Sequence, residues 1–268
     1  TMFKKILSIF IFTAYTLLSM ASGNKAKLEC VYRLTYQTDT VNKRNVDALM
    51  ALRIGDSQSL FYPQAKFESD SLSQNASSIS ELRAIKDSIR SKYGRITATF
   101  YVLKNFDKNQ IDFVDNAMQT YKYTEPLSVF DWKYTDERKM IGEHECQKAT
   151  CNFGGRSYEV WFAPDIPISD GPWKFYGLPG LILEAYDIQH HYEFTFLGMR
   201  ECAGEVAIPI DDYVKTTKYD FLKTKQLSID DPNAFLAGIA VTMGIKGDKV
   251  PKRHFYKTME LVESVKKK

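Results

Sequence analysis

Hydrophobic and polar residues alternate along most of the chain, and this period-two pattern predicts β-strands with one buried face. The segment 28–36, LECVYRLTY, places Cys30, Tyr32 and Leu34 on one face and mostly charged or polar residues on the other. From residue 139 onward the same pattern predicts successive strands separated by turn residues. These strands are expected in CQKATCNF (146–153), RSYEVWFAP (156–164), GLILEAYD (180–187) and YEFTFLGM (192–199).

Two hairpins are predicted in the first half of the chain. Residues 48–63 and residues 96–117 each combine two apolar-rich runs around a short polar turn, as β-hairpins do. In the first hairpin, Gly55, Asp56 and Ser57 supply the turn. Both segments therefore extend the predicted sheet.

Helical spacing appears in fewer places. In residues 79–94, isoleucine and leucine recur every three or four positions, and Gly94 can end the helix. The polar stretch 69–80 that leads into it is predicted to be a loop. A later helix is expected where Asp231 can act as the cap and Pro232 can take the first helical position.

Strands that follow one another with short turns predict an antiparallel meander. We therefore expect an α+β fold that is mainly antiparallel β. Because one face of the predicted sheet is aromatic and apolar, the sheet is expected to curve, as a meander or half-barrel with two or three packed helices.

The short stretch GLPGL at residues 177–181 predicts a type II turn. Pro179 presets φ at the second turn position, and Gly180 supplies the positive φ that the third position requires. Gly177 adds conformational freedom just before the turn. The stretch lacks the glycine spacing and the following helix of a phosphate-binding loop. A structural corner and a ligand-binding loop both remain open.

Aromatic residues gather around this turn. Trp161, Trp173, Phe175, Tyr176 and Leu178 are the candidate binding residues, because aromatic side chains beside a loop shaped by proline and glycine can form the wall of an apolar pocket. Packing in the core is the alternative explanation for the same residues.

The N-terminus is typical of a secretory signal. Lys4 and Lys5 precede an apolar stretch, and small residues follow it, so residues 1–23 are predicted to be a signal peptide. The apolar stretch is shorter than the roughly 20 residues that a membrane-spanning helix needs, which disfavours an uncleaved anchor. Residues 24–268 are then expected to form a single exported domain, located in the periplasm, at the outer membrane or outside the cell.

Composition and charge narrow the possible partners. The chain has 268 residues, of which 44% are hydrophobic and 13% aromatic, enough for one substantial core. Loss of Lys4 and Lys5 lowers the formal net charge from +3 to +1. Because positive and negative charges are interspersed, binding to nucleic acid or to an anionic membrane is not predicted. The short apolar stretch also argues against an integral membrane protein.

Export changes the interpretation of the four cysteines. In an oxidising compartment, Cys30, Cys146, Cys151 and Cys202 are disulfide candidates. In a straight strand Cys146 and Cys151 would lie on opposite faces roughly 16 Å apart, too far to bond to each other. Each would then need Cys30 or Cys202. A metal site at His144, Cys146 and Cys151 fits no structural zinc spacing.

Several short motifs in residues 146–187 occur together. They are C-x-K-A-T, a G-R strand that ends in W-F, I-P-x-x-x-G-P-W-K-F, and GLPGLI at residues 177–182. This block resembles the signature of the GLPGLI family, exported proteins of Gram-negative bacteria with no established biochemical activity. The resemblance implies that residues 24–268 are a GLPGLI-type domain whose signature is residues 146–187.

The search for catalytic motifs gives one weak match. RIGDSQSL resembles the nucleophile block of GDSL-type ester hydrolases, with Ser57 as the nucleophile. Such an enzyme needs a late Asp-x-x-His pair, but His254 has no aspartate three residues before it. No enzyme activity, cofactor or resident metal is predicted, and ester hydrolysis is retained as a minor alternative.

Other polar residues near the signature have simpler explanations. His190 and His191 are expected in an exposed turn between two strands. Asp165, Asp170 and Glu184 flank the signature loop, but spacing alone does not show the geometry of an acid–base pair.

Two functions follow from these observations. The first is a protein that binds an apolar ligand, a lipid or a peptide, on the aromatic face of its sheet. The second is an accessory protein of the cell envelope that binds another exported protein through the signature loop or a sheet edge.

Overall fold

The computed structural model describes residues 25–39, 42–117, 119–231, 233 and 258–265. The predicted signal peptide, residues 1–23, lies outside the described residues. Most of the helix expected after Pro232 also lies outside them.

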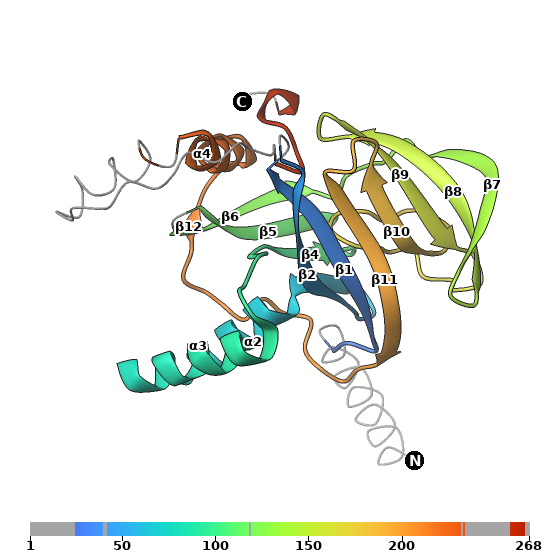
Figure 1. Ribbon diagram of the computed structural model, residues 1–268. Coiled ribbons are helices and arrows are strands. Elements are labelled where there is room, and N and C mark those ends of the chain that lie inside the picture. Colours follow the sequence, from blue (N-terminus) through green and yellow to red (C-terminus); the bar gives the residue numbers. More distant parts are fainter. Residues whose placement is uncertain (1–24, 40–41, 118, 232, 234–257, 266–268) are drawn as a thin grey trace, which may run out of the picture.

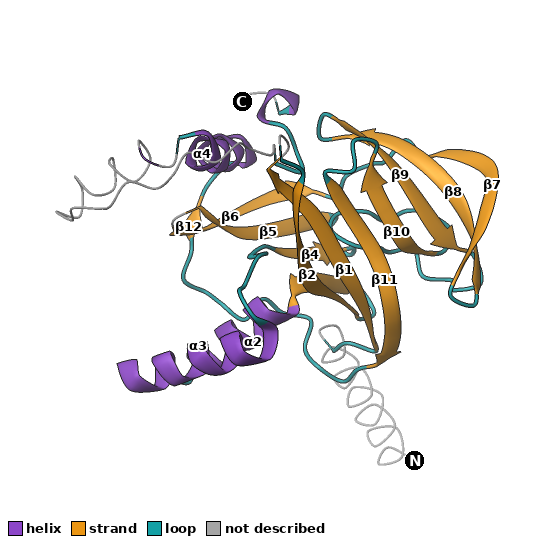
Figure 2. Ribbon diagram, viewed as in Figure 1, coloured by secondary structure: helices purple, strands orange, loops and turns teal. Residues whose placement is uncertain are grey.

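Twelve strands of the described chain form one sheet, and three α-helices accompany it (Figure 2). The strands are β1 (Leu28–Asp39), β2 (Arg44–Ile54), β3 (Gln58–Pro63), β4 (Tyr101–Asn105), β5 (Gln110–Ala117), β6 (Gln119–Pro126), β7 (Lys133–Ile141), β8 (His144–Phe153), β9 (Arg156–Ala163), β10 (Leu181–Asp187), β11 (Tyr192–Glu201) and β12 (Val214–Lys215). The helices are α2 (Gln64–Ser73), α3 (Ile79–Tyr93) and α4 (Lys218–Asp230), and the short 3₁₀ helix η2 (Val262–Ser264) follows near the C-terminus.

The sheet consists of two antiparallel meanders. Its strand order is β12-β6-β5-β4-β3-β2-β1-β11-β10-β9-β8-β7, so β1 to β6 form one meander and β7 to β11 form the other. The two meet where β1 pairs antiparallel with β11. Only β12 pairs in parallel, with β6. The predicted antiparallel meander is therefore confirmed, with one long-range pairing that joins its halves.

Side chains on the two faces of the first meander enter different hydrophobic clusters. Along β3, Phe61 belongs to the larger cluster, whereas Leu60 and Tyr62 belong to the smaller one. Helix α4 contributes Phe221 to the larger cluster, and α2 packs Phe67 against the smaller one. Figure 1 shows α4 and the pair α2–α3 on opposite sides of these strands. This part of the sheet is therefore buried on both faces.

Most predicted elements of the first half agree with the structure. The strand at 28–36, the hairpin at 48–63 and the helix at 79–94 are confirmed. Ser78 caps that helix by accepting a hydrogen bond from the Glu81 amide, and Gly94 ends it with a φ of 76°.

Two expectations about the fold need revision. Residues 69–80 were expected to be a loop, but α2 continues through Ser73. The sheet is mostly antiparallel and is accompanied by three helices, as expected, but it is open: β12 and β7 are its two edges. The half-barrel is not confirmed.

The disulfide prediction is not confirmed, because all four cysteines are free thiols in this structure. Cys30, Cys146 and Cys151 lie in the larger hydrophobic cluster, while Cys202 packs against the smaller one. Burial raises the pKa of the Cys30 and Cys151 thiols to about 12 and that of Cys146 to about 11. The buried thiols therefore pack as small apolar groups.

No helix in the described part of the chain combines the length and the apolar character that crossing a membrane requires.

Candidate functional site

Residues 164–180 form the loop between β9 and β10. It contains the I-P-x-x-x-G-P-W-K-F motif and the first four residues of GLPGLI, and we call it the signature loop. The predicted type II turn is wrong in its geometry. Gly177 has the positive φ, 93°, whereas Gly180 is not among the residues with positive φ. Gly180 is required for a different reason: a Cβ there would lie 2.2 Å from the carbonyl oxygen of Ala163. The glycine lets the loop return closely against the end of β9.

A buried lysine on β4 holds the first half of the signature loop. The Lys104 ammonium is fully buried and pairs with the Asp170 carboxylate. It also donates hydrogen bonds to the carbonyl oxygens of Gly171, at 2.9 Å, and Phe175, at 3.2 Å. Burial lowers the pKa of Lys104, and the single carboxylate of Asp170 offsets only part of that effect. Asp170 therefore has a buried ion-pair partner that links the loop to β4.

A second buried lysine holds the middle of the loop. Lys174 is fully buried, pairs with the carboxylates of Glu125 and Glu260, and donates a 3.0 Å hydrogen bond to the Tyr123 hydroxyl. Burial by itself lowers the pKa of Lys174, but the carboxylates outweigh burial, and the pKa lies above its usual value. Lys218 on α4 pairs with the same two carboxylates. Two ammonium groups and two carboxylates thus neutralise one another inside the protein.

Glu260 belongs to residues 258–265, which we call the C-terminal segment. Arg156 on β9 donates two hydrogen bonds, of 3.1 and 3.0 Å, to the Thr258 carbonyl oxygen. The Tyr158 hydroxyl donates to the Met259 carbonyl oxygen at 2.9 Å. At Gly154 an added Cβ would lie 2.7 Å from the Glu260 side chain. The C-terminal segment is therefore fastened to β9 and to the turn before it.

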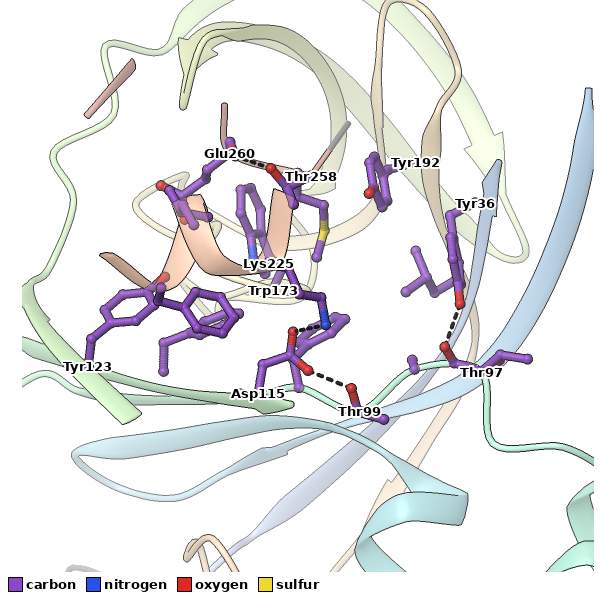
Figure 3. Close-up of a pocket in the computed structure, with 17 residues that line it drawn as sticks. Tyr36, Thr97, Thr99, Asp115, Tyr123, Trp173, Tyr192, Lys225, Thr258 and Glu260 are labelled. Atoms are coloured by element: carbon purple, nitrogen blue, oxygen red, sulfur yellow. Dashed lines mark hydrogen bonds and ion pairs between the residues drawn. The ribbon is translucent and has the colours of Figure 1, made fainter. Parts of the chain in front are cut away.

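Between the C-terminal segment, α4 and the sheet lies a cavity of about 90 Å³, which we call the aromatic cavity (Figure 3). Two pairs of stacked rings line it, Tyr36 with Tyr192 and Phe100 with Phe113, each with ring centroids 6.0 Å apart. Its other lining residues are Leu34, Thr97, Ala98, Thr99, Asp115, Tyr123, Trp173, Phe221, Leu222, Lys225, Thr258, Met259 and Glu260.

The charged groups around the aromatic cavity are paired within the protein. Figure 3 shows the Lys225 ammonium against the Asp115 carboxylate, and the two lie 2.9 Å apart. Thr99 donates a hydrogen bond to the same carboxylate, and the Tyr36 hydroxyl donates to the carbonyl oxygen of Thr97. With Glu260 held by Lys174, the cavity has a neutral, mostly apolar wall.

Trp173 differs from the other residues of this wall in two respects. Its φ is 54°, a left-handed conformation that is unusual for a bulky side chain. Its indole N–H is buried and has no hydrogen-bond acceptor among the described residues. Such orphaned buried donors are rare in native proteins and cost about 1–3 kcal/mol each.

Only one of the five predicted binding residues lines the aromatic cavity, and that residue is Trp173. Phe175 and Leu178 are buried in the larger hydrophobic cluster, and Tyr176 packs against its edge. Trp161 lies in β9, where the Lys139 ammonium is 4.4 Å from its ring centroid. These four side chains do not line the aromatic cavity, and a binding role for them stays a prediction.

Most residues of the cavity wall were not predicted from the sequence. Tyr36 and Tyr192 were visible as the aromatic ends of two alternating segments, and this signal could have singled them out. Lys225 on α4 and the residues of the C-terminal segment carried no such signal, because they are remote in sequence from the signature.

The candidate catalytic residues are dispersed. Ser57 lies in the turn between β2 and β3, as the hairpin prediction placed it, and His254 lies outside the described residues. His144 pairs with Asp165 at 2.6 Å, and Glu184 pairs with Lys139 at the same distance.

The two neighbouring histidines have separate partners. His190 contacts Glu193 at 2.9 Å, and the His191 ring lies 3.1 Å from the Arg156 guanidinium. Among the described residues, no three histidine, cysteine or acidic side chains gather in a group that could hold a metal ion.

Sequence comparison relates the signature loop to an uncharacterised family. A family profile described as "Protein of unknown function (Porph_ging)" matches residues 155–184, inside the block that resembles the GLPGLI signature. The match supports an uncharacterised family and does not confirm the GLPGLI assignment. None of the curated proteins matches the chain.

Structural comparison finds similar folds. "Structure of PNGF-II in P21 space group" has a TM-score of 0.51 and 13% identity, over 76% of this chain and 34% of that one. "Structure of PNGF-II in C2 space group" has a TM-score of 0.49 and 12% identity, over 76% and 33%. The chain thus spans about a third of the PNGF-II chain. At this identity, the first likeness concerns the fold alone.

Proposed function

We propose that the protein binds a small apolar group, bearing one hydrogen-bond acceptor, in the aromatic cavity. The observation that carries the proposal is the buried Trp173 indole N–H, which lacks an acceptor among the described residues and belongs to a side chain of the cavity wall. A ligand oxygen would satisfy this donor, and the stacked rings around it would cover the apolar part of the ligand.

The backbone of Trp173 supports the same proposal. Residues held in sparsely populated φ/ψ regions cost about 1–3 kcal/mol and gather at ligand-binding and active sites. Lys174, the next residue, is held by two carboxylates and Tyr123, which fixes the backbone beside Trp173. The contacts of Lys174 thus hold Trp173 in a backbone conformation that tryptophan rarely adopts.

The size of the cavity limits the ligand. A volume of about 90 Å³ suits one ring or a short aliphatic chain rather than a whole lipid. Met259, on the C-terminal segment, already contributes its side chain to this wall. Of the two ligand classes expected from the sequence, a peptide that presents one apolar side chain therefore fits better than a lipid.

The proposal is tested with two probes of similar size, cyclohexanone, which has an acceptor, and methylcyclohexane, which has none. Their affinities are measured by ligand-observed NMR titration of the parent and of Trp173→Phe, which keeps an aromatic ring and removes the N–H. Loss of one hydrogen bond is expected to weaken cyclohexanone binding about 3-fold to 10-fold and to leave methylcyclohexane unchanged.

Trp161→Phe is the matched control, because Trp161 does not line the aromatic cavity. It should leave both affinities unchanged. Failure of both probes to bind the parent would overturn the proposal. So would an equal loss of cyclohexanone affinity in the two tryptophan variants.

The second expected function, binding of another exported protein, has less support at the sheet edge. The edge strand β7 is exposed and carries charged residues at five of its nine positions. Charges on an edge strand discourage pairing with a further strand. A partner that contacts the signature loop stays a prediction.

We also propose that the chain is an exported GLPGLI-type protein whose open sheet bends around its aromatic face. The N-terminal pattern of lysines, apolar residues and small residues supports export. The profile match at residues 155–184 falls within the signature block and is compatible with such a family. Absence of the mature chain from the osmotic-shock, outer-membrane and culture-medium fractions of expressing cells would contradict export.

A further inference from the structure

A second cavity, of about 380 Å³, lies beside the hairpin of helices α2 and α3. Its floor is the face of β1 and β2 where Arg33 pairs with Leu49. The start of α2, the end of α3 and residues 95–98 close it. Its volume is within the range of ordinary small-molecule pockets. We call it the cationic cavity.

Three cationic side chains line the cationic cavity, and two of them have no partner. Within the described part of the chain, neither Arg33 nor Arg95 takes part in an ion pair or a side-chain hydrogen bond, and both are exposed. Lys92 pairs with Glu68 at 2.6 Å. Asp47 is the acidic residue of the lining, and it accepts a 2.8 Å hydrogen bond from Thr35. The lining therefore has an excess of positive charge.

The end of α3 explains only part of this charge. Carbonyl oxygens at a helix C-terminus attract cations, which accounts for Lys92 in the last turn. Arg33 belongs to β1, and Arg95 follows the cap residue Gly94. Two guanidinium groups from different elements thus line one cavity, and neither is ion-paired within the described residues.

The remaining lining is mostly apolar, with Thr97 as its polar residue. Leu49 is 43% exposed, a large fraction for a leucine. Pro63, Tyr93 and Ile96 line the same cavity. A ligand held here would meet guanidinium groups with its charged end and apolar side chains with its body.

We infer that the cationic cavity binds an oxyanion, the carboxylate or phosphate group of a small molecule with a short apolar body. Guanidinium groups present paired N–H donors that match both kinds of oxyanion. Because Thr97 and Ala98 also line the aromatic cavity, the two cavities share a wall, but the inference does not depend on the proposed function.

The test is isothermal titration calorimetry of the full chain with two probes, sodium hexanoate and inorganic phosphate, at low ionic strength because salt screens exposed charges. The variants are Arg33→Gln, Arg95→Gln and the double variant. Removal of one charge-assisted contact is expected to weaken binding about 10-fold to 100-fold. Tighter binding of hexanoate would assign a carboxylate ligand with an apolar chain, and tighter binding of phosphate would assign a phosphate group.

Arg83→Gln is the matched control, because Arg83 lies on α3, is exposed and does not line the cavity. It should bind both probes as the parent does. The inference fails if neither probe binds the parent, or if Arg83→Gln weakens binding as much as the cavity variants. Since Arg33 and Arg95 are exposed, their variants should unfold at the parent's temperature, which separates loss of the site from loss of the fold.

Discussion

The aromatic cavity and the cationic cavity share a wall, but their charged side chains differ: those around the first are paired, and two of those in the second are not. Around the aromatic cavity, Lys174 and Lys225 are paired with carboxylates, so the group left without a partner is the neutral Trp173 N–H. In the cationic cavity, Arg33 and Arg95 form no ion pair or side-chain hydrogen bond with the described residues. The paired charges hold the wall of the aromatic cavity in place. The unpaired charges of the cationic cavity are available to bind a ligand.

The largest loss of stability is expected when the ion pairs of Lys174 are broken. Lys174→Met leaves the carboxylates of Glu125 and Glu260 without their central partner, and removing one member of a buried ion pair costs about 3–5 kcal/mol. Urea unfolding should show this loss. Lys223→Met, at an exposed lysine of α4, should change stability by less than about 0.5 kcal/mol.

A second variant separates charge from packing at the same site. Lys174→Met combined with Glu260→Gln should recover part of the loss, because one of the unpaired carboxylates is then removed as well. Strictly additive losses would show that Lys174 and Glu260 do not stabilise each other. A parent-like stability of Lys174→Met would contradict the pairing itself.

A smaller effect is expected at Gly180. A Cβ there would overlap the Ala163 carbonyl oxygen, and overpacking of this kind costs about 1–3 kcal/mol. Gly180→Ala should lower the stability and shift the signature loop that carries Trp173, without changing hexanoate binding by the cationic cavity. Thermal unfolding and calorimetry measure the two effects.

Gly142→Ala gives the comparison for Gly180, because Gly142 has a φ of 61° and no atom within 4 Å of an added Cβ. The stability lost in Gly142→Ala therefore reports the backbone strain of an alanine at positive φ, with no steric contact added. If Gly180→Ala melts at the parent's temperature, the close approach of the loop to β9 is wrong.

The smallest effect is expected on the stability of the protein at acidic pH. Burial by itself raises the pKa of Glu125, but Lys174 and Lys218 outweigh burial, so its pKa lies below the ordinary value of 4.5. The contribution of Glu125 to stability is therefore complete above about pH 4.5 and is lost as the pH falls through the lower folded value. Glu125→Gln should be less stable at neutral pH and lose less stability on acidification.

Unfolding free energies of the parent and Glu125→Gln, measured from pH 7 down to pH 3, check this prediction. Glu143→Gln, at an exposed carboxylate, should keep the pH dependence of the parent. Parallel pH curves for the parent and Glu125→Gln would contradict it.

The local pattern of hydrophobic and polar residues was enough to predict the strands and α3. The alternation at 28–36 and the spacing at 79–94 depend on neighbouring residues alone, and both elements formed as expected. Helix α2 was missed because none of its residues is buried and its second half is rich in serine and aspartate, which favour turns. Helix α4 was missed because the residues one turn after its buried Phe221 and Leu222 are polar, which interrupts the apolar repeat before Ile229.

The candidate site was predictable only in part. The cluster of aromatic residues singled out Trp173, but its positive φ depends on the loop around it. Gly180 was recognised as important for a turn, although a close approach to Ala163 explains it. Lys174 and Glu260 lie 86 positions apart, and no local signal links such a pair. Unpaired Arg33 and Arg95 became visible only when the fold placed them at one cavity.

The most direct test of the central claim is the indole N–H resonance of Trp173 in a ¹H–¹⁵N spectrum, assigned by its absence in Trp173→Phe. The chain has three tryptophans, Trp132, Trp161 and Trp173. On addition of cyclohexanone, the Trp173 resonance alone should move to higher proton frequency, as a new hydrogen bond requires. A Trp173 resonance that stays in place while the probe is bound would contradict the account.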